Sequence, residues 1–108
     1  MKVFWTPSAR RRLKEIEAYI ARENSADVAR EVVVRILQRT LTLEQHPSLG
    51  TRLRHYADED IRELLERPYR VIFRAKPEQV EIIAVLHYRQ LLPSDLQGLD
   101  AEIGRRSS

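Results

Sequence analysis

The chain has 108 residues, of which 43% are hydrophobic and 32% charged, and it carries a net charge of +3, which predicts one soluble globular domain. This length excludes two full-sized domains, and this composition excludes a disordered tail or a fibre. The sequence has no cysteine and no apolar run near the roughly 18 residues of a membrane span, so we expect a cytoplasmic protein without disulfides or thiolate metal sites.

The first half of the chain predicts a short strand followed by two helices. Residues 3–5 are apolar and lead into a Thr-Pro pair that suits the start of a helix. Apolar residues then recur at spacings of three and four, which predicts amphipathic helices over about 7–22 and 25–46, the second ended by Pro47. The short connection predicts an antiparallel helical hairpin. The two apolar stripes are Ala9, Leu13, Ile16 and Ile20, then Ala29, Val32 or Val33, Ile36, Leu37, Thr40 and Leu43.

The second half of the chain predicts a loop and three strands. Residues 51–60 are mostly polar and predict a loop, and residues 61–65 predict a strand. Residues 69–75 and 80–87 predict the two arms of a β-hairpin, because a Lys-Pro-Glu-Gln sequence between them favours a tight turn. One face of this hairpin is expected to be covered by the helices.

The register of the hairpin follows if its loop has two residues. Arg74 then lies opposite Glu81 as a cross-strand ion pair. The face under the helices comprises Val71, Phe73, Ile82 and Ala84. The other face combines an apolar floor with a basic rim, which predicts a docking surface for an acidic, amphipathic partner segment. Its members are Arg70, Ile72, Ile83, Val85 and His87, with Arg89 in the same alternation. A loop one residue longer would exchange the two faces.

The basic residues are strongly biased toward arginine. Of the 19 basic residues, 16 are arginine and three are lysine. The planar guanidinium binds carboxylates and phosphates through paired hydrogen bonds, so the bias favours an acidic partner, either protein or nucleic acid. The base composition of the genome is an equally good explanation.

Few residues suggest chemistry. The three histidines lack the spacing of metal ligands, and no glycine-rich loop resembles a nucleotide site. His87 is a candidate general base or a structural histidine at a strand end. Arg70 interrupts an apolar strand and is a candidate for binding a phosphate or a partner carboxylate, with a plain surface arginine as the alternative. Arg52 and Arg54 lie in the polar loop, either to grip a nucleic-acid backbone or simply solvated.

The order of several motifs resembles the RelE/ParE superfamily of bacterial toxins from toxin–antitoxin systems, and the ParE branch in particular. The likeness covers roughly residues 3–93. The motifs are Trp5-Thr6, Ala9, Leu13, Ile16, Tyr19-Ile20 and Asn24, His46-Pro47 with Gly50, Arg62-Glu63-Leu64, Tyr69-Arg70-Val71-Ile72-Phe73, and Val85-Leu86-His87-Tyr88-Arg89. We place a single toxin domain at residues 1–97 and a flexible tail at 98–108.

The resemblance implies an α+β fold in which an N-terminal strand and an antiparallel helical hairpin pack with a small antiparallel β-sheet. It also implies a cognate antitoxin whose flexible segment wraps the toxin. ParE-like toxins poison DNA gyrase and arrest growth, whereas RelE-like toxins cut mRNA in the ribosome. Neither activity implies a metal or a cofactor.

The two branches make different chemical demands. Cutting RNA without a metal requires a base, an acid and cations around one phosphate. Arg70 matches the strand arginine of RelE-like enzymes, but the chain after Arg89 has no Tyr, His or Lys to act as their terminal acid–base group. The sequence therefore favours a toxin that binds gyrase without catalysis, with Arg70, Tyr88 and Arg89 contacting the target.

Two alternatives remain open. One is a ribosome-dependent mRNA endonuclease in which Arg70 acts with His87, Tyr88, Arg89, Arg52 and Arg54. The other is a degenerate toxin that serves only to bind its antitoxin.

Overall fold

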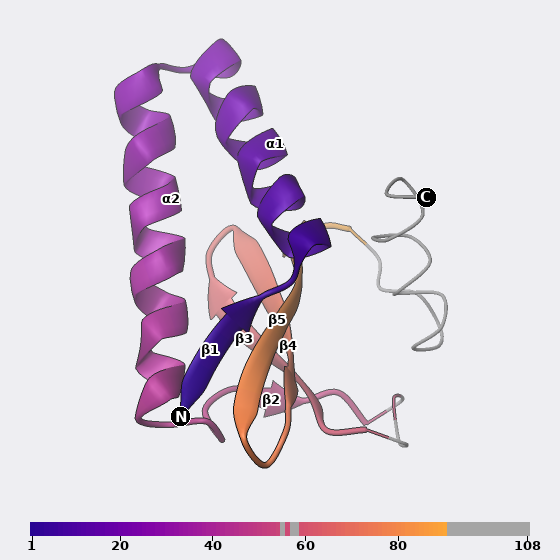
Figure 1. Ribbon diagram of the computed structural model, residues 1–108. Coiled ribbons are helices and arrows are strands. Elements are labelled where there is room, and N and C mark those ends of the chain that lie inside the picture. The colour runs from indigo at the N-terminus through magenta and orange to yellow at the C-terminus, as the bar shows by residue number, and fades with distance from the viewer. Residues whose placement is uncertain (55, 57–58, 91–108) are drawn as a thin grey trace.

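Two helices pack on one face of a five-stranded sheet (Figure 1). The computed structural model describes residues 1–54, 56 and 59–90. The elements are β1 (Lys2–Trp5), α1 (Pro7–Glu23), α2 (Ala26–Leu41), the 3-10 helix η1 (Thr42–Glu44), β2 (Thr51–Arg52), β3 (Ile61–Glu66), β4 (Tyr69–Ala75) and β5 (Gln79–His87). This architecture confirms the expected α+β class. The predicted tail at 98–108 lies outside the described residues.

The strands follow the order β1-β5-β4-β3-β2 across the sheet. β1 pairs parallel with β5, whereas the other neighbours are antiparallel. The pairing of β1 with β5 joins the two ends of the domain, and no local sequence pattern predicts it. β2 was expected to be loop, and it is a strand of only two residues at the edge of the sheet.

The helices begin where the sequence predicts. The hydroxyl of Thr6 accepts a hydrogen bond from the backbone N–H of Ala9 at 3.2 Å, and Ser25 does the same for Val28 at 3.1 Å. α2 ends earlier than expected, at Leu41. The hydroxyls of Thr40 and Thr42 donate to carbonyls three residues back, which competes with regular helical geometry and accompanies the change to η1.

The main core lies between the helices and the sheet. Its buried members from the helical side are Ala9, Leu13, Ile20, Ala29, Ile36 and Leu43, and from the sheet Leu64, Tyr69, Val71, Phe73, Val80, Ile82 and Val85. Phe73 is completely buried, as the hairpin register predicts. Leu37 was expected in the stripe, but it is 38% exposed.

The predicted hairpin register is right near the turn and wrong beyond it. Arg74 pairs with Glu81 as predicted, but a bulge then follows, after which each β5 residue is displaced by one position. Val71 pairs with Val85 instead of Ala84. Because strand side chains alternate, Val85 now faces the helices and Ala84 the opposite side.

The predicted apolar docking floor on the far face is also wrong. Ile72 and Ile83 are buried at 0% and 4% exposure, and both belong to a second core cluster. Tyr56 is a buried member of that cluster, and Leu53 packs against it. The segment before β3, for which the sequence predicts a polar loop, therefore contributes the apolar side chains of Leu53 and Tyr56, which cover part of the sheet face opposite the helices.

Candidate functional site

Arg70 lies on the sheet face opposite the helices, where Glu63 of β3 holds it in place. Its Nε donates to Oε2 of Glu63 at 2.8 Å, and its Nη2 donates to the same oxygen. Its Nη1 donates to the carbonyl of Gln90 at 3.4 Å. The two charged side chains are only 18% and 15% exposed. The guanidinium is therefore fixed in orientation, and its charge is largely balanced within the protein.

A cleft of about 710 Å³ opens beside this ion pair at the turn end of the β3–β4 hairpin. We call it the Arg70 cleft, and its lining residues are Glu63, Leu65, Arg67, Pro68, Arg70 and Tyr88. Leu65 is 43% exposed and Tyr88 is 53% exposed, so the cleft presents apolar surface to solvent. The guanidinium of Arg89 lies 5.8 Å from the centre of the Tyr88 ring.

His87 lies on the other face of the sheet. It pairs with Tyr69 in the β4–β5 register, and the two rings meet edge to face with centroids 5.8 Å apart. Its Nδ1 accepts a hydrogen bond from the backbone N–H of Arg89 at 3.2 Å. His87 was predicted to share a face with Arg70, and the bulge in β5 is the reason that it does not.

A small pocket of about 330 Å³ separates His87 from α1. Arg12, Glu15, Ile16, Tyr19, Tyr69, His87 and Gln90 line it. Burial, and secondarily the neighbouring Tyr19, raises the pKa of the Tyr69 phenol above its ordinary value of 10.0. The Tyr69 phenol is therefore neutral at physiological pH and is not suited to act as a general base.

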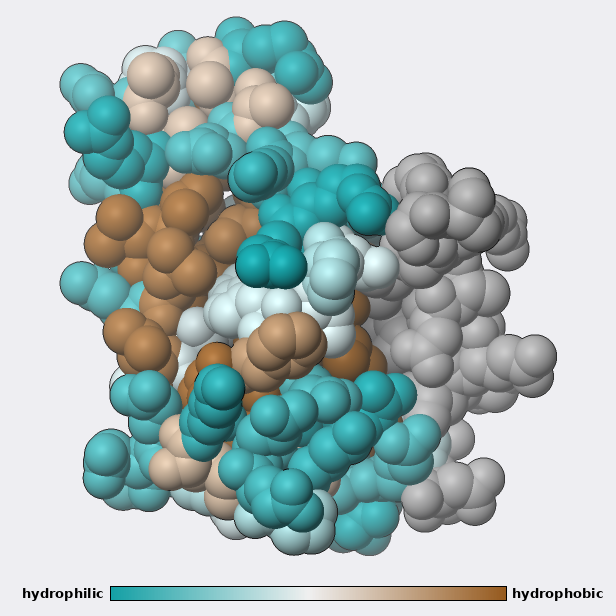
Figure 2. Space-filling view, viewed as in Figure 1, coloured by the Kyte–Doolittle hydropathy of each residue, from teal (hydrophilic) through white to brown (hydrophobic). Residues whose placement is uncertain are grey.

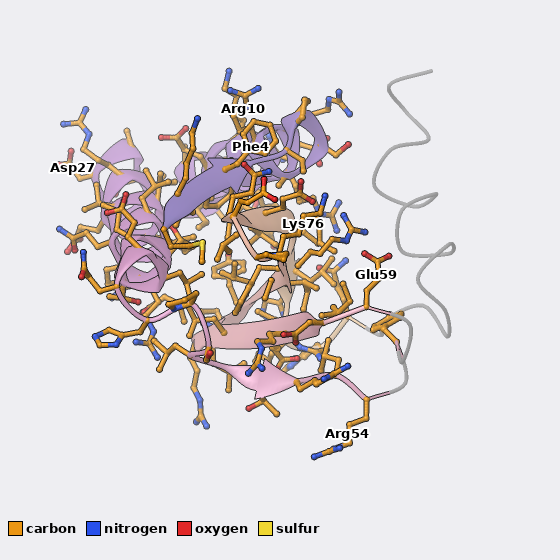
Figure 3. All side chains as sticks on the ribbon, turned by 60° about the horizontal axis from the view of Figure 1, so that its bottom comes forward. Phe4, Arg10, Asp27, Arg54, Glu59 and Lys76 are labelled. Atoms are coloured by element: carbon orange, nitrogen blue, oxygen red, sulfur yellow. The ribbon has the colours of Figure 1, made fainter. Side chains whose placement is uncertain are left out.

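The two loop arginines do not join Arg70. Arg52 is opposite Arg62 in the β2–β3 pairing, and cross-strand partners share a face. Arg62 is adjacent to Glu63 along β3, so Arg52 and the pair of Glu63 with Arg70 lie on opposite faces. Arg54, two residues after β2, is exposed and projects outward (Figure 3). Of the six candidate nuclease residues, Tyr88 lines the cleft with Arg70, and both Arg89 and His87 contact the Tyr88 ring. Arg52 and Arg54 do not join them.

A second surface feature is an apolar groove of about 500 Å³ between β1 and the two helices. We call it the β1 groove. Its lining residues are Val3, Phe4, Trp5, Leu13, Val33 and Leu37, with the charged residues Arg10, Lys14 and Glu17. Figure 2 shows the hydrophobic patch over α2 that borders this region, surrounded by hydrophilic residues. Phe4 and Arg10 project from the same side of the molecule (Figure 3).

The sequence also contains a signal for exposed apolar surface on α2, which meets the β1 groove at Leu37. Val34, Leu37 and Leu41 follow one another at spacings of three and four, so they form a second apolar row on α2. Their exposed fractions are 42%, 38% and 54%. A helix that is apolar on more than its core-facing stripe indicates a further packing partner.

No group of three metal-ligating side chains comes together among the described residues. None of the helices within residues 1–54, 56 and 59–90 is both long enough and apolar enough to cross a membrane.

Comparison with known proteins points to one family. The family model described as "ParE toxin of type II toxin-antitoxin system, parDE" matches residues 3–92. A curated protein of Sinorhizobium fredii strain NGR234, Y4kP, whose name assigns it to the toxins, is 35% identical over 95 residues, which cover 88% of this chain and 96% of that protein. A solved structure of the "Chromosomal ParDE TA system from P. aeruginosa" matches with a TM-score of 0.70 and 25% identity, covering 81% of this chain and 95% of the other.

The matched range contains the lining of the Arg70 cleft and of the β1 groove and, apart from Lys2 at the start of β1, every element of the fold. The resemblance drawn from the sequence motifs is confirmed, and with it the expectation of an antitoxin partner. The chain belongs to the ParE toxin family of type II toxin–antitoxin systems.

Proposed function

We propose that this ParE-family toxin inhibits DNA gyrase by binding it, performs no catalysis of its own, and is neutralised when its antitoxin covers the β1 groove. The observation that carries the first part is the separation of the candidate nuclease residues. Arg70 is ion-paired with Glu63 on one face of the sheet, whereas His87 lies on the other face against Tyr69. The side chain of His87 therefore points away from the face on which a phosphate would contact Arg70.

Catalysis of RNA cleavage needs charge at the phosphate that is available when the transition state forms. A carboxylate that already accepts two hydrogen bonds from Arg70 competes for that charge. The same arrangement suits protein recognition, in which a rigid guanidinium orients a partner. The geometry therefore supports a binding toxin over the alternative of a ribosome-dependent nuclease.

The β1 groove supports antitoxin binding, which the sequence had assigned to the sheet face with Ile72, Ile83 and Val85. Those three side chains are buried and cannot contact a partner. The β1 groove is accessible instead, because its Phe4 and Leu37 are 40% and 38% exposed. An amphipathic helix could place its apolar face in the groove. Acidic residues on its flank would lie near Arg10 and Lys14, which rim the groove.

The target is tested with purified toxin in two assays. Gyrase supercoiling should be blocked at toxin concentrations that leave ribosome-bound mRNA intact. Cleavage of that mRNA at codon boundaries, with supercoiling unaffected, would show that the nuclease alternative is correct. If neither process is affected and expression of the toxin alone does not arrest growth, the chain is a degenerate toxin.

The antitoxin surface is tested with two aspartate substitutions on α2. Leu37 lines the β1 groove and Val28 does not, yet each is 38% exposed. Leu37→Asp should weaken capture of the cognate antitoxin by at least about tenfold, because it puts an unpaired charge in an apolar contact. Val28→Asp is the matched control and should bind as wild type. Equal binding by both variants would exclude the groove as the antitoxin site.

A further inference from the structure

At the Arg70 cleft, the residues that the structure describes carry more positive than negative charge. Arg67 lines the cleft, and Arg89 lies over Tyr88 at its rim. Both are exposed, and neither side chain forms an ion pair with another described residue. Among the described residues that line the cleft, Glu63 is the one carboxylate, and Arg70 already engages it. An approaching anion would therefore meet uncompensated positive charge.

Arg70 is prepared to bind an additional acceptor. Of the five N–H groups of its guanidinium, one each on Nε, Nη1 and Nη2 is used by Glu63 and Gln90. One N–H on each of Nη1 and Nη2 is left for a ligand. Because Glu63 and Gln90 hold the group from two sides, a ligand does not have to order this side chain, and the entropic cost of binding is reduced.

The cleft combines this charge with apolar walls. Leu65 and Tyr88 are about half exposed, and Pro68 forms part of the same lining. The Tyr88 ring already stacks on His87, with centroids 5.0 Å apart and planes at 27°, and Arg89 lies over it. These contacts leave the Tyr88 ring poorly available for stacking on a nucleobase. A carboxylate beside an apolar side chain fits the lining better than a nucleotide does.

We propose that the Arg70 cleft binds an acidic segment of the toxin's protein target, with a carboxylate between Arg67 and Arg70 and a neighbouring apolar side chain against Leu65 and Tyr88. This inference rests on the proposed function, in which the target is a protein. The Arg70 cleft lies at the turn between β3 and β4. The β1 groove, the proposed antitoxin site, lies at β1, and β5 and β4 separate the two in the sheet. The target and the antitoxin thus contact different residues of the toxin.

The cleft is tested directly by NMR on the full chain labelled with ¹⁵N. The probes are a capped peptide of alternating Glu and Leu, the same peptide with Gln for Glu, and oligothymidylate. The acidic peptide should shift the signals of Leu65, Arg67, Arg70 and Tyr88, and the neutral peptide should not. Shifts confined to other residues would contradict the proposal. Stronger shifts with oligothymidylate at these four residues would mean that the cleft binds nucleic acid instead.

Charge specificity is tested by Arg67→Gln, which should weaken binding of the acidic peptide by about tenfold. Arg30→Gln is the control, because Arg30 is an exposed arginine on α2 that lines neither surface feature. It should bind the peptide as wild type does. Circular dichroism confirms that both variants are folded.

The same pair of variants connects the cleft to the target. Arg67→Gln should raise the toxin concentration needed for half-inhibition of gyrase by about tenfold, with antitoxin binding unchanged. If Arg67→Gln inhibits gyrase as well as wild type does, the cleft is not the target site, and the proposed function stands. If wild-type toxin does not inhibit gyrase while the acidic peptide still binds the cleft, the proposed function fails and the cleft remains a site for acidic protein segments.

Discussion

At the scale of single residues, the arginines that the structure describes fall into two groups. Several arginines are structural, because they bind carboxylates within the sheet. Arg74 contacts both Glu59 and Glu81, and Arg70 binds Glu63. Others, such as Arg67, are exposed and available to a partner. The hairpin register predicted the pair of Arg74 with Glu81, but the pairs of Arg74 with Glu59 and of Arg70 with Glu63 depend on how β3 and the segment before it pack against β4.

Glu81, which binds Arg74, provides a test of the arginines that have a structural role. Burial opposes ionisation of its carboxyl, but hydrogen bonds from Lys76, Arg74 and Gln79 outweigh burial and lower the pKa below its ordinary value of 4.5. A carboxyl with a lowered pKa in the folded state stabilises the protein above its unfolded pKa and loses that effect as the pH falls through the folded pKa. Glu81→Gln should therefore show a shallower loss of unfolding free energy below about pH 4.5 than wild type, measured by urea denaturation across pH. Parallel curves for the two proteins would contradict this assignment.

Gly50 is required by its backbone conformation and by a close contact. Its φ is 99°, and a Cβ at this position would lie 2.6 Å from the carbonyl oxygen of Glu63. Gly50→Ala should lower the free energy of unfolding by at least about 1 kcal/mol. Ser48→Ala, at an exposed position in the same turn, should change it by less than about 0.5 kcal/mol. Denaturant titrations that show equal stability for both variants would exclude strain at Gly50.

At the scale of elements, local sequence signals determined the bounds of helices and strands, whereas tertiary contacts determined the bulge in β5. The Thr-Pro start and the three-and-four spacing predicted α1 almost to the residue. The strand β4 has the predicted bounds, and β5 begins one residue earlier than predicted. The bulge in β5 had no signal of its own, since every residue around it is apolar and fits either face. It nevertheless decided which side chains share the face of Arg70.

The junction of β1 and α1 should contribute more than an ordinary helix cap. The Thr6 hydroxyl caps α1 and also donates to the carbonyl of Ile82 in β5 at 3.0 Å. Thr6→Ala removes both hydrogen bonds and should cost about 2 kcal/mol of unfolding free energy. Ser25→Ala removes only the exposed cap of α2 and should cost about 1 kcal/mol or less. Thermal or urea unfolding would measure both losses, and a smaller loss for Thr6→Ala would refute the double role.

At the scale of the whole molecule, the sheet is buried on both faces by different means. The helices cover one face, and the segment around Leu53 and Tyr56 covers part of the other. The apolar surface left exposed is then concentrated on α2 and β1, and at the cleft. This distribution is typical of a protein that functions in complexes, because exposed apolar patches bordered by charge mark interaction surfaces.

A matched pair of phenylalanines tests this division between core and surface. Phe73 is fully buried beneath the helices, whereas Phe4 is 40% exposed in the β1 groove. Phe73→Ala should lower the unfolding free energy by about 3–5 kcal/mol, because it leaves a cavity in the main core. Phe4→Ala should lower it by about 1 kcal/mol and should weaken antitoxin capture instead. Urea denaturation and antitoxin binding measure the two effects, and similar losses of stability would refute the division.

The candidate site could be predicted only in part. The sequence assigned target binding to Arg70, Tyr88 and Arg89, and in the structure Tyr88 lines the cleft with Arg70 while Arg89 lies over the Tyr88 ring. It did not reveal Glu63, Leu65 or Arg67 as neighbours of Arg70, because these residues belong to another strand and turn. It also assigned His87 to the wrong face, since a single extra residue in a strand reverses every later side chain.

The sequence by itself determined the helices, the hairpin and the membership of the ParE toxin family, because periodicity, caps and motif order are local properties of the chain. Only the tertiary structure decided which sheet face is closed, which arginines are neutralised and where apolar surface is left for partners. The physical reason is that these properties depend on contacts between different elements of the fold, such as the pairing of β1 with the distant β5 and the ion pair of Arg70 in β4 with Glu63 in β3.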